Sequence, residues 1–217
     1  MRTRFGLDVP TPLSELCRPD RMALIVYDMQ LGIVRQLGDG AAVTAQVGRV
    51  LSSARATGVR IIFTRHMSLP LKLMGNFQLR QAMSWQKLTD PDQVQSWFLR
   101  GSPNFEIVPE LAPRADEAVI DKIAFSAFEG TPLATILRDC GLTAFAIVGI
   151  AIEIGIDPTA RHGADLGLVP IIVQDACGAG EPEAARRSFA NLAWMGDAIM
   201  TDVAAFSTAL HRSDQMR

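Results

Sequence analysis

Short apolar runs alternate with segments of helical periodicity along most of the chain. The apolar runs cover residues 22–28, 59–65, 117–122, 143–152, 169–176 and 198–205, and helical segments lie at 41–57, 132–139, from 158 onwards and at 181–195. This alternation is typical of β-α-β units built on a mostly parallel sheet. The run at 143–152 is the most apolar, as expected for a central strand buried on both faces. The pattern therefore predicts an α/β fold.

One long segment, residues 67–113, departs from this alternation. It contains Phe77, Trp85, Trp97 and Phe98, two helix-like pieces and scattered prolines. A connection of this length inside a compact domain usually acts as a lid, a binding loop or a subunit contact. We expect residues 1–20 to form an N-terminal extension and residues 21–217 a single domain, with 67–113 as a lid or interface insertion.

Composition narrows the classes of partner. The formal net charge is −2, and Lys and Arg form no run, so nucleic acid and anionic membranes are not expected as partners. The arginines near the N-terminus precede no apolar core of a secretory signal. Three cysteines without a CxxC pair indicate a reducing compartment. The expected location is the cytoplasm.

Charged residues stand where predicted strands end. Asp28 ends the first run and Lys122 ends the third. In an open parallel sheet, ligands bind beyond the carboxyl ends of the strands. Charges at such depth are costly unless they are paired or used. Position alone leaves a structural alternative open, namely a helix-capping aspartate and a surface lysine.

Three sequence blocks carry a family resemblance. They are D-M-Q at Asp28, K-I-A-F-S-A-F starting at Lys122, and G-I-A-I-E-I-G at 149–155 followed by P-T-A-R. In this order and spacing, the chain resembles the isochorismatase-like (cysteine hydrolase) superfamily from Met22 to Ala205. The resemblance implies a three-layer α/β/α Rossmann-like fold with a six-stranded parallel sheet. It also implies a hydrolase of a small molecule that assembles as a homodimer or homotetramer.

The resemblance further assigns roles to individual residues. Most members use an Asp–Lys–Cys triad, in which Asp28 and Lys122 match the first two members and Gly155 stands at the position of the cysteine. The family's non-proline cis peptide corresponds to Ile150–Ala151. The N–H groups of Ala151 and Gly155 would then form an oxyanion hole.

Glycine supplies no nucleophile, so a thioester route at Gly155 is excluded. Isochorismatases share this departure: their aspartate acts as a general acid toward a vinyl ether, water adds without a covalent intermediate, and the missing side chain leaves room for substrate. Asp28 would have to be protonated for this role, whereas the neighbouring Lys122 favours the carboxylate. If the triad geometry is intact, Gly155→Cys is expected to create a reactive thiol.

Glu153 adds a second carboxylate to this block. It is a candidate acid or base, and the alternative is a solvated glutamate or one paired with Arg161. Arg161 could meet a substrate carboxylate or serve as a structural tie. The residues expected to bind substrate are Gln30, His66, Phe125, Ser126, Phe128 and Arg161.

A metal site and a cofactor are not expected. Family members that bind a metal use an aspartate and two histidines after the second strand, whereas here that stretch contains only His66, and the next histidine is His162. This pattern lacks the ligand count of a metal site. Cys177, which follows the fifth strand, is interpreted as a small buried residue rather than a displaced nucleophile.

Three functions remain open at this point. The first is a cysteine-independent hydrolase of a small, anionic metabolite by Asp-assisted water addition, of the vinyl ether-cleaving type. The second is an amide or ester hydrolase that uses water activated by Asp28 or Glu153. The third is a catalytically dead member that serves as a binding or oligomerising module.

Overall fold

A six-stranded parallel sheet forms the centre of the molecule. The computed structural model describes residues 2–9 and 13–215. The strand order is β5-β4-β3-β6-β7-β8, and every neighbouring pair is parallel. The strands are β3 (Met22–Tyr27), β4 (Arg60–His66), β5 (Ala118–Lys122), β6 (Ala144–Ile150), β7 (Val169–Gly178) and β8 (Ile199–Thr201). The α/β class and the six-stranded parallel sheet expected from the sequence are confirmed.

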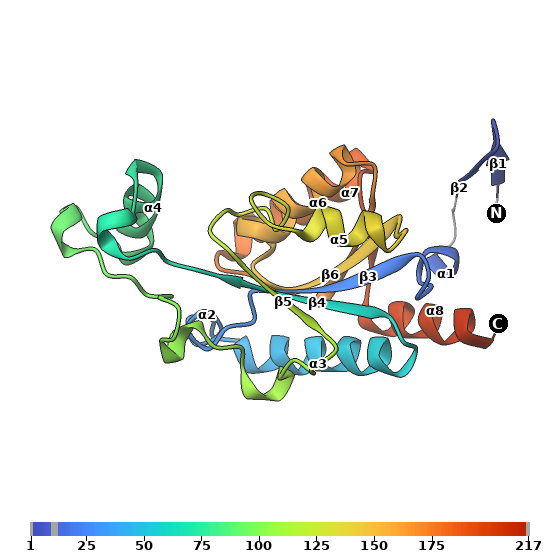
Figure 1. The fold of residues 1–217 in the computed structure, drawn as a ribbon, viewed down its shortest axis with the longest axis horizontal. Coiled ribbons are helices and arrows are strands. Elements are labelled where there is room, and N and C mark those ends of the chain that lie inside the picture. Colours follow the sequence, from blue (N-terminus) through green and yellow to red (C-terminus); the bar gives the residue numbers. More distant parts are fainter. Residues whose placement is uncertain (1, 10–12, 216–217) are drawn as a thin grey trace.

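Helices cover both faces of the sheet (Figure 1). On one face lie α3 (Gly40–Ala56) and α8 (Val203–Gln215), and on the other lie α5 (Leu133–Asp139), α6 (Asp157–Asp165) and α7 (Pro182–Met195). Side chains of β3 alternate between two apolar clusters: Leu24 and Val26 pack in one, Ile25 and Tyr27 in the other. This alternation follows from the two-residue period of a strand, and it gives the three layers a core on each side.

The N-terminal residues form a small separate unit. Strands β1 (Arg2–Arg4) and β2 (Leu7–Val9) pair antiparallel with each other, apart from the main sheet, and α1 (Leu13–Leu16) follows (Figure 1). The sequence pattern did not predict this hairpin. Because each strand has only three residues, the apolar alternation on which strand prediction depends is too short to recognise.

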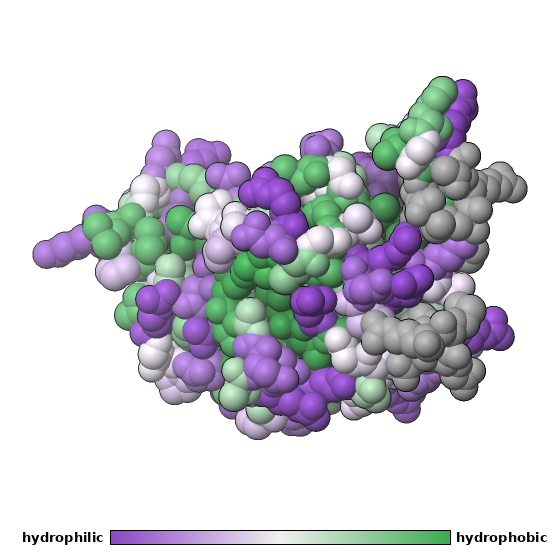
Figure 2. All heavy atoms as spheres, turned by 45° about the vertical axis from the view of Figure 1, so that its right-hand side comes forward, coloured by the Kyte–Doolittle hydropathy of each residue, from purple (hydrophilic) through white to green (hydrophobic). Residues whose placement is uncertain are grey.

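Residues 67–113 contain no strand of the main sheet among the described residues. The segment contains η1 (Leu71–Leu73), α4 (Asn76–Gln86), η2 (Pro91–Gln93), η3 (Pro103–Phe105) and η4 (Pro109–Leu111). Helix α4 lies beyond one end of the sheet (Figure 1), and the short α2 (Leu31–Val34), which follows β3, packs against η3 and α3. Hydrophobic residues also gather in a hollowed area on the molecular face shown in Figure 2. The roles of 67–113 as a lid or interface remain predictions.

Two predicted strands end earlier than expected. The apolar run 143–152 leaves the sheet after Ile150, and residues Ile152–Ile156 form a single π-helical turn, η5. The run 198–205 is extended only over Ile199–Thr201, because the Asp202 carboxylate accepts the Ala205 N–H at 2.7 Å and so caps the start of α8. No helix within the described part of the chain is long and apolar enough to cross a membrane.

Candidate active site

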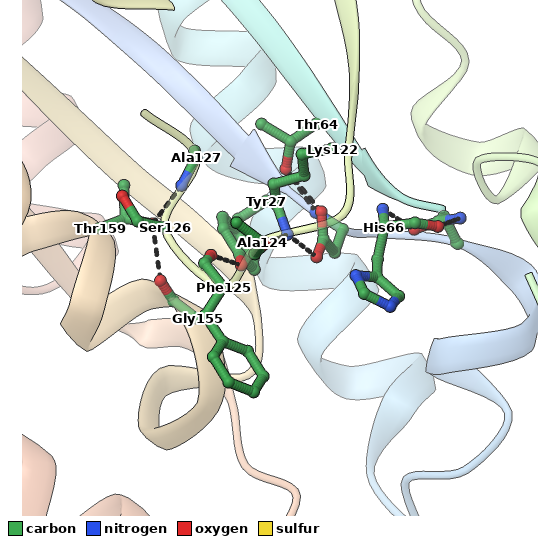
Figure 3. Close-up of polar contacts among 12 residues, drawn as sticks. Tyr27, Thr64, His66, Lys122, Ala124, Phe125, Ser126, Ala127, Gly155 and Thr159 are labelled. Atoms are coloured by element: carbon green, nitrogen blue, oxygen red, sulfur yellow. Dashed lines mark hydrogen bonds and ion pairs between the residues drawn. The ribbon is translucent and has the colours of Figure 1, made fainter. Parts of the chain in front are cut away.

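Asp28 and Lys122 meet at the carboxyl ends of β3 and β5. Asp28 follows β3 with a left-handed φ of 48°, which turns its side chain into the space between the strands. Its Oδ2 accepts a hydrogen bond from Lys122 Nζ at 2.7 Å, and its Oδ1 accepts one from Thr64 Oγ1 at 2.6 Å (Figure 3). Both charged residues are almost fully buried. An ion pair with both carboxylate oxygens occupied is the arrangement expected of a deprotonated aspartate.

The Lys122 ammonium has two further contacts. It donates to the Ala124 carbonyl at 3.2 Å and lies 4.3 Å from the centroid of the Tyr27 ring. Burial lowers the pKa of Lys122, and the adjacent Asp28 opposes that change. The lysine is therefore held by a carboxylate, a carbonyl and an aromatic face at once.

Tyr27 occupies the space beside Gly155. A Cβ atom built at Gly155 would overlap the Tyr27 hydroxyl and lie 2.7 Å from the ring carbon Cε1. Carbon atoms in contact normally stay about 3.5–4.0 Å apart. The sequence led us to expect that the missing side chain leaves room for substrate. That expectation is wrong, because the ring of the chain's single tyrosine fills the space.

Tyr27 also connects two parts of the site. Its hydroxyl donates a hydrogen bond to the Phe125 carbonyl in the loop after β5 (Figure 3). Burial, reinforced by the charge of Asp28, raises the pKa of the Tyr27 phenol well above its usual value. The phenol is consequently a neutral donor at physiological pH, and it is not an activated nucleophile.

The turn that carries Gly155 begins at a cis peptide bond between Ile150 and Ala151, as the resemblance implied. The Gly155 N–H donates to the Ala151 carbonyl at 3.1 Å, and the Gly155 carbonyl accepts from Thr159 Oγ1 at 2.6 Å. A substrate oxygen at the expected oxyanion hole would therefore compete with an existing bond for the Gly155 N–H. The oxyanion role of Ala151 and Gly155 remains a prediction.

Glu153 lies in the same turn and is held by the backbone. Its Oε1 accepts the N–H groups of Gly180 at 2.7 Å and Glu181 at 2.8 Å, just before α7 begins. Its Oε2 is buried and accepts no hydrogen bond from a described residue. Arg161 does not pair with it, because Arg161 bonds to Asp157 and Asp197 instead. One oxygen is thus fixed by two N–H groups, and the other is a buried acceptor without a hydrogen-bond partner among the described residues.

These groups line one cavity of about 420 Å³. Its charged lining residues are Asp28, Lys122, Glu153 and Glu181. Its aromatic lining comes from β3, from the end of β4, from residues 67–113 and from the loop after β5. The aromatic residues are Tyr27, His66, Trp85, Trp97, Phe98 and Phe125. The volume falls within the range typical of small-molecule sites.

His66 and Phe125 are the two predicted substrate-binding residues that line the cavity. The His66 ring packs edge-on against Trp85 and Phe98, with ring centroids 5.6 and 5.7 Å apart. Burial, with the neighbouring Lys122 charge as a second cause, lowers the pKa of His66 to about 4. The imidazole is therefore neutral at physiological pH.

The other four predicted binding residues lie outside the cavity lining. Gln30 is fully buried and ties the backbones of His66 and Phe105 together. Ser126 hydrogen-bonds to His162 at 3.0 Å, and Phe128 packs against Phe145 in the core. Arg161 is bound by its two carboxylates. All four side chains contact other parts of the protein rather than line the cavity, although the Arg161 Nη2 is buried without a hydrogen-bond partner among the described residues.

Histidines and cysteines provide no alternative site. Within the described part of the chain, no cluster of three or more His, Cys, Asp or Glu residues could hold a metal ion. Cys177 does not follow the strand as expected but lies within β7 and is half-buried, with its Sγ 3.3 Å from the Val173 carbonyl. Burial raises the pKa of the Cys177 thiol, and it raises that of Cys17 to about 12. A raised thiol pKa is the opposite of what activates a reactive cysteine.

Sequence reasoning missed several residues of the site. Tyr27 and Thr64 were not singled out, although a bulky aromatic directly before Asp28 is a detectable signal. Trp85, Trp97 and Phe98 were assigned to lid or interface packing, and the structure places them in the cavity wall. Glu181 carried no sequence signal, because only the fold brings the start of α7 beside Glu153.

Comparison with known proteins agrees with this architecture. The Isochorismatase domain profile matches residues 22–204, so the chain belongs to the isochorismatase family. Ureidoacrylate amidohydrolase RutB from Serratia proteamaculans is 28% identical over 186 residues, covering 78% of this chain and 75% of that protein. RutB from Acinetobacter baylyi is 26% identical over 200 residues, covering 82% and 81%.

Solved structures show the same fold. A cysteine hydrolase from Pseudomonas syringae superposes with a TM-score of 0.75 at 24% identity, covering 90% of this chain and 95% of that one. An isochorismatase family protein from Desulfovibrio vulgaris gives a TM-score of 0.74 at 25% identity, covering 88% and 98%. The three-layer arrangement of this chain is therefore that of its family.

Proposed function

We propose that this chain is a hydrolase that cleaves a small amide-type C–N bond with water activated by Glu153, and that it forms no thiol intermediate. The observation that carries the proposal is the Glu153 carboxylate, a residue that lines the same cavity as the Asp28–Lys122 pair: two backbone N–H groups fix Oε1, and Oε2 is buried without a hydrogen-bond partner among the described residues. Buried polar atoms are nearly always satisfied, so an unpartnered carboxylate oxygen in a site points to a substrate or water contact.

Glu153 is better placed as the base than Asp28. Both Asp28 oxygens already accept hydrogen bonds, from Thr64 and Lys122. A general base must be within hydrogen-bond reach of the proton that it removes, and Glu153 Oε2 is the free carboxylate oxygen. Asp28 then holds the Lys122 ammonium in position, and that ammonium stabilises negative charge developing on the substrate oxygen.

The same geometry disfavours vinyl ether cleavage. That reaction needs a protonated acid, but the Asp28 carboxylate accepts from an ammonium and a hydroxyl together. In hydrolysis, by contrast, Glu153 takes a proton from water as the oxygen attacks the carbonyl carbon. The C–N bond then breaks, and the proton passes to the leaving nitrogen. Two relatives named as amidohydrolases support a C–N bond as the target.

A product assay tests this function. The purified protein is incubated separately with a panel of small amides and ureides and with isochorismate, and both ammonia and pyruvate are measured. We expect ammonia release from at least one amide or ureide and no pyruvate. Pyruvate release from isochorismate would overturn the proposal in favour of vinyl ether cleavage. If no compound of the panel released ammonia or pyruvate, the proposal would be overturned in favour of a binding module.

A further inference from the structure

The cavity carries an excess of negative charge over positive. Lys122 is the one lysine or arginine among its described lining residues, and its charge is matched by Asp28 at 2.7 Å. Glu153 and Glu181 accept only backbone N–H groups, and neither forms an ion pair with a described residue. His66 adds no positive charge, because burial lowers its pKa to about 4.

Aromatic rings form much of the remaining wall. Trp85 packs edge-on against Phe125 and Trp97 against Phe98, with centroids 6.4 Å apart in each pair. Aromatic faces bind cations, and several rings combined with carboxylates are the recognition mode used for alkylated ammonium groups. The wall already holds one cation in this way, since the Lys122 ammonium lies 4.3 Å from the centroid of Tyr27.

Apart from Lys122, which Asp28 already pairs, the described lining offers no cation to a substrate carboxylate. The cation expected from the sequence to meet a substrate carboxylate, Arg161, lies outside the lining and bonds to Asp157 and Asp197. A substrate carboxylate in this cavity would face two carboxylates and the hydrophobic faces of the rings. The anionic metabolite favoured by the sequence is therefore disfavoured by the charges that the fold assembles.

We infer that the substrate of this site carries a positively charged, alkylated amine, which lies against Trp85, Trp97 and Phe125 with Glu153 and Glu181 nearby. This inference rests on the proposed function, because it places the ligand in the same cavity. The scissile group lies at the inner end, beside Lys122 and Glu153, and the ammonium lies toward the aromatic wall. The cavity volume of about 420 Å³ accommodates a small molecule that carries both groups.

Three matched probes test the charge preference without requiring turnover. They are choline, its neutral isostere 3,3-dimethyl-1-butanol and the anion 3,3-dimethylbutanoate, and binding is measured by isothermal titration calorimetry. We expect choline to bind roughly tenfold more tightly than the alcohol, with the anion weakest. Equal binding of choline and the alcohol, tighter binding of the anion, or no binding of choline at millimolar concentration would overturn the inference.

Two variants locate the interaction. Trp97→Leu and Glu153→Gln should each weaken choline binding several-fold. Glu153→Gln should leave the affinity for the neutral alcohol little changed, because it removes only a charge. The control variant Glu183→Gln, at an exposed position on α7, should change the affinity for neither ligand. If neither cavity variant affects choline, the ammonium site is elsewhere and the inference fails. Because binding is read without catalysis, failure here is distinguishable from failure of the amide product assay.

Discussion

Replacing Gly155 by alanine is expected to lower the free energy of unfolding by about 1–3 kcal/mol, the usual range for overpacking a filled site. The backbone of Gly155 does not require glycine, because its φ lies outside the left-handed region. The cost arises from Tyr27, whose buried ring and hydroxyl occupy the place of the added Cβ. Urea unfolding of both proteins measures the difference.

A second glycine and a second-site change provide the controls. Gly48→Ala, in the middle of α3 with its nearest neighbour 3.6 Å away, should be neutral or slightly stabilising. Tyr27→Val should make Gly155→Ala less costly, so that the double variant is more stable than the sum of the single effects by about 1 kcal/mol or more. Additive effects, or a Gly155→Ala protein as stable as the wild type, would contradict the assignment of Tyr27 to this space.

The same overlap changes what Gly155→Cys should do. The sequence predicts that this change creates a reactive thiol. In the structure even the Cβ of a new cysteine overlaps Tyr27, so the side chain has no room until Tyr27 is also made smaller. Chemical labelling of this position is therefore informative only in the Tyr27→Val background.

Glu153→Gln is expected to reduce kcat by roughly 100- to 10,000-fold, the contribution typical of a general base. Glutamine keeps the size of the side chain, and its amide oxygen can still accept from Gly180 and Glu181. The loss is therefore chemical rather than structural. Steady-state ammonia release on the substrate found by the panel measures it.

Glu183→Gln is the matched control for this variant. Glu183 is an exposed carboxylate in the first turn of α7 that pairs with Arg186, so its loss should leave kcat unchanged. A Glu153→Gln enzyme with nearly wild-type kcat and an unchanged unfolding curve would remove Glu153 from the chemistry.

Much of the fold could be predicted because apolar periodicity is a local property. The six runs that predict strands lie within a few residues of β3 to β8, and Asp28 and Lys122 stand at strand ends where the topology brings them together. The early end of β6 was not visible in the pattern, since Ala151 and Ile152, which follow the strand, are as apolar as the strand itself.

The contents of the site were harder to predict because they depend on three-dimensional packing. Whether the Gly155 position is open or filled depends on where a strand-end tyrosine points, and a sequence pattern does not encode that direction. The partner of Glu153 is a pair of backbone N–H groups about 27 residues away, which no side-chain motif marks. The charge balance of the cavity likewise follows from Arg161 pairing outside it.

The central claim is that this site acts without a thiol, and a cysteine-free protein tests it most directly. Ammonia release is measured for the variant that combines Cys17→Ala, Cys140→Ala and Cys177→Ala, after circular dichroism has shown that it is folded. We predict kcat/KM within about fivefold of the wild type, because desolvation raises the pKa of the Cys17 and Cys177 thiols and so disfavours the reactive thiolate. A folded variant without activity would contradict the account.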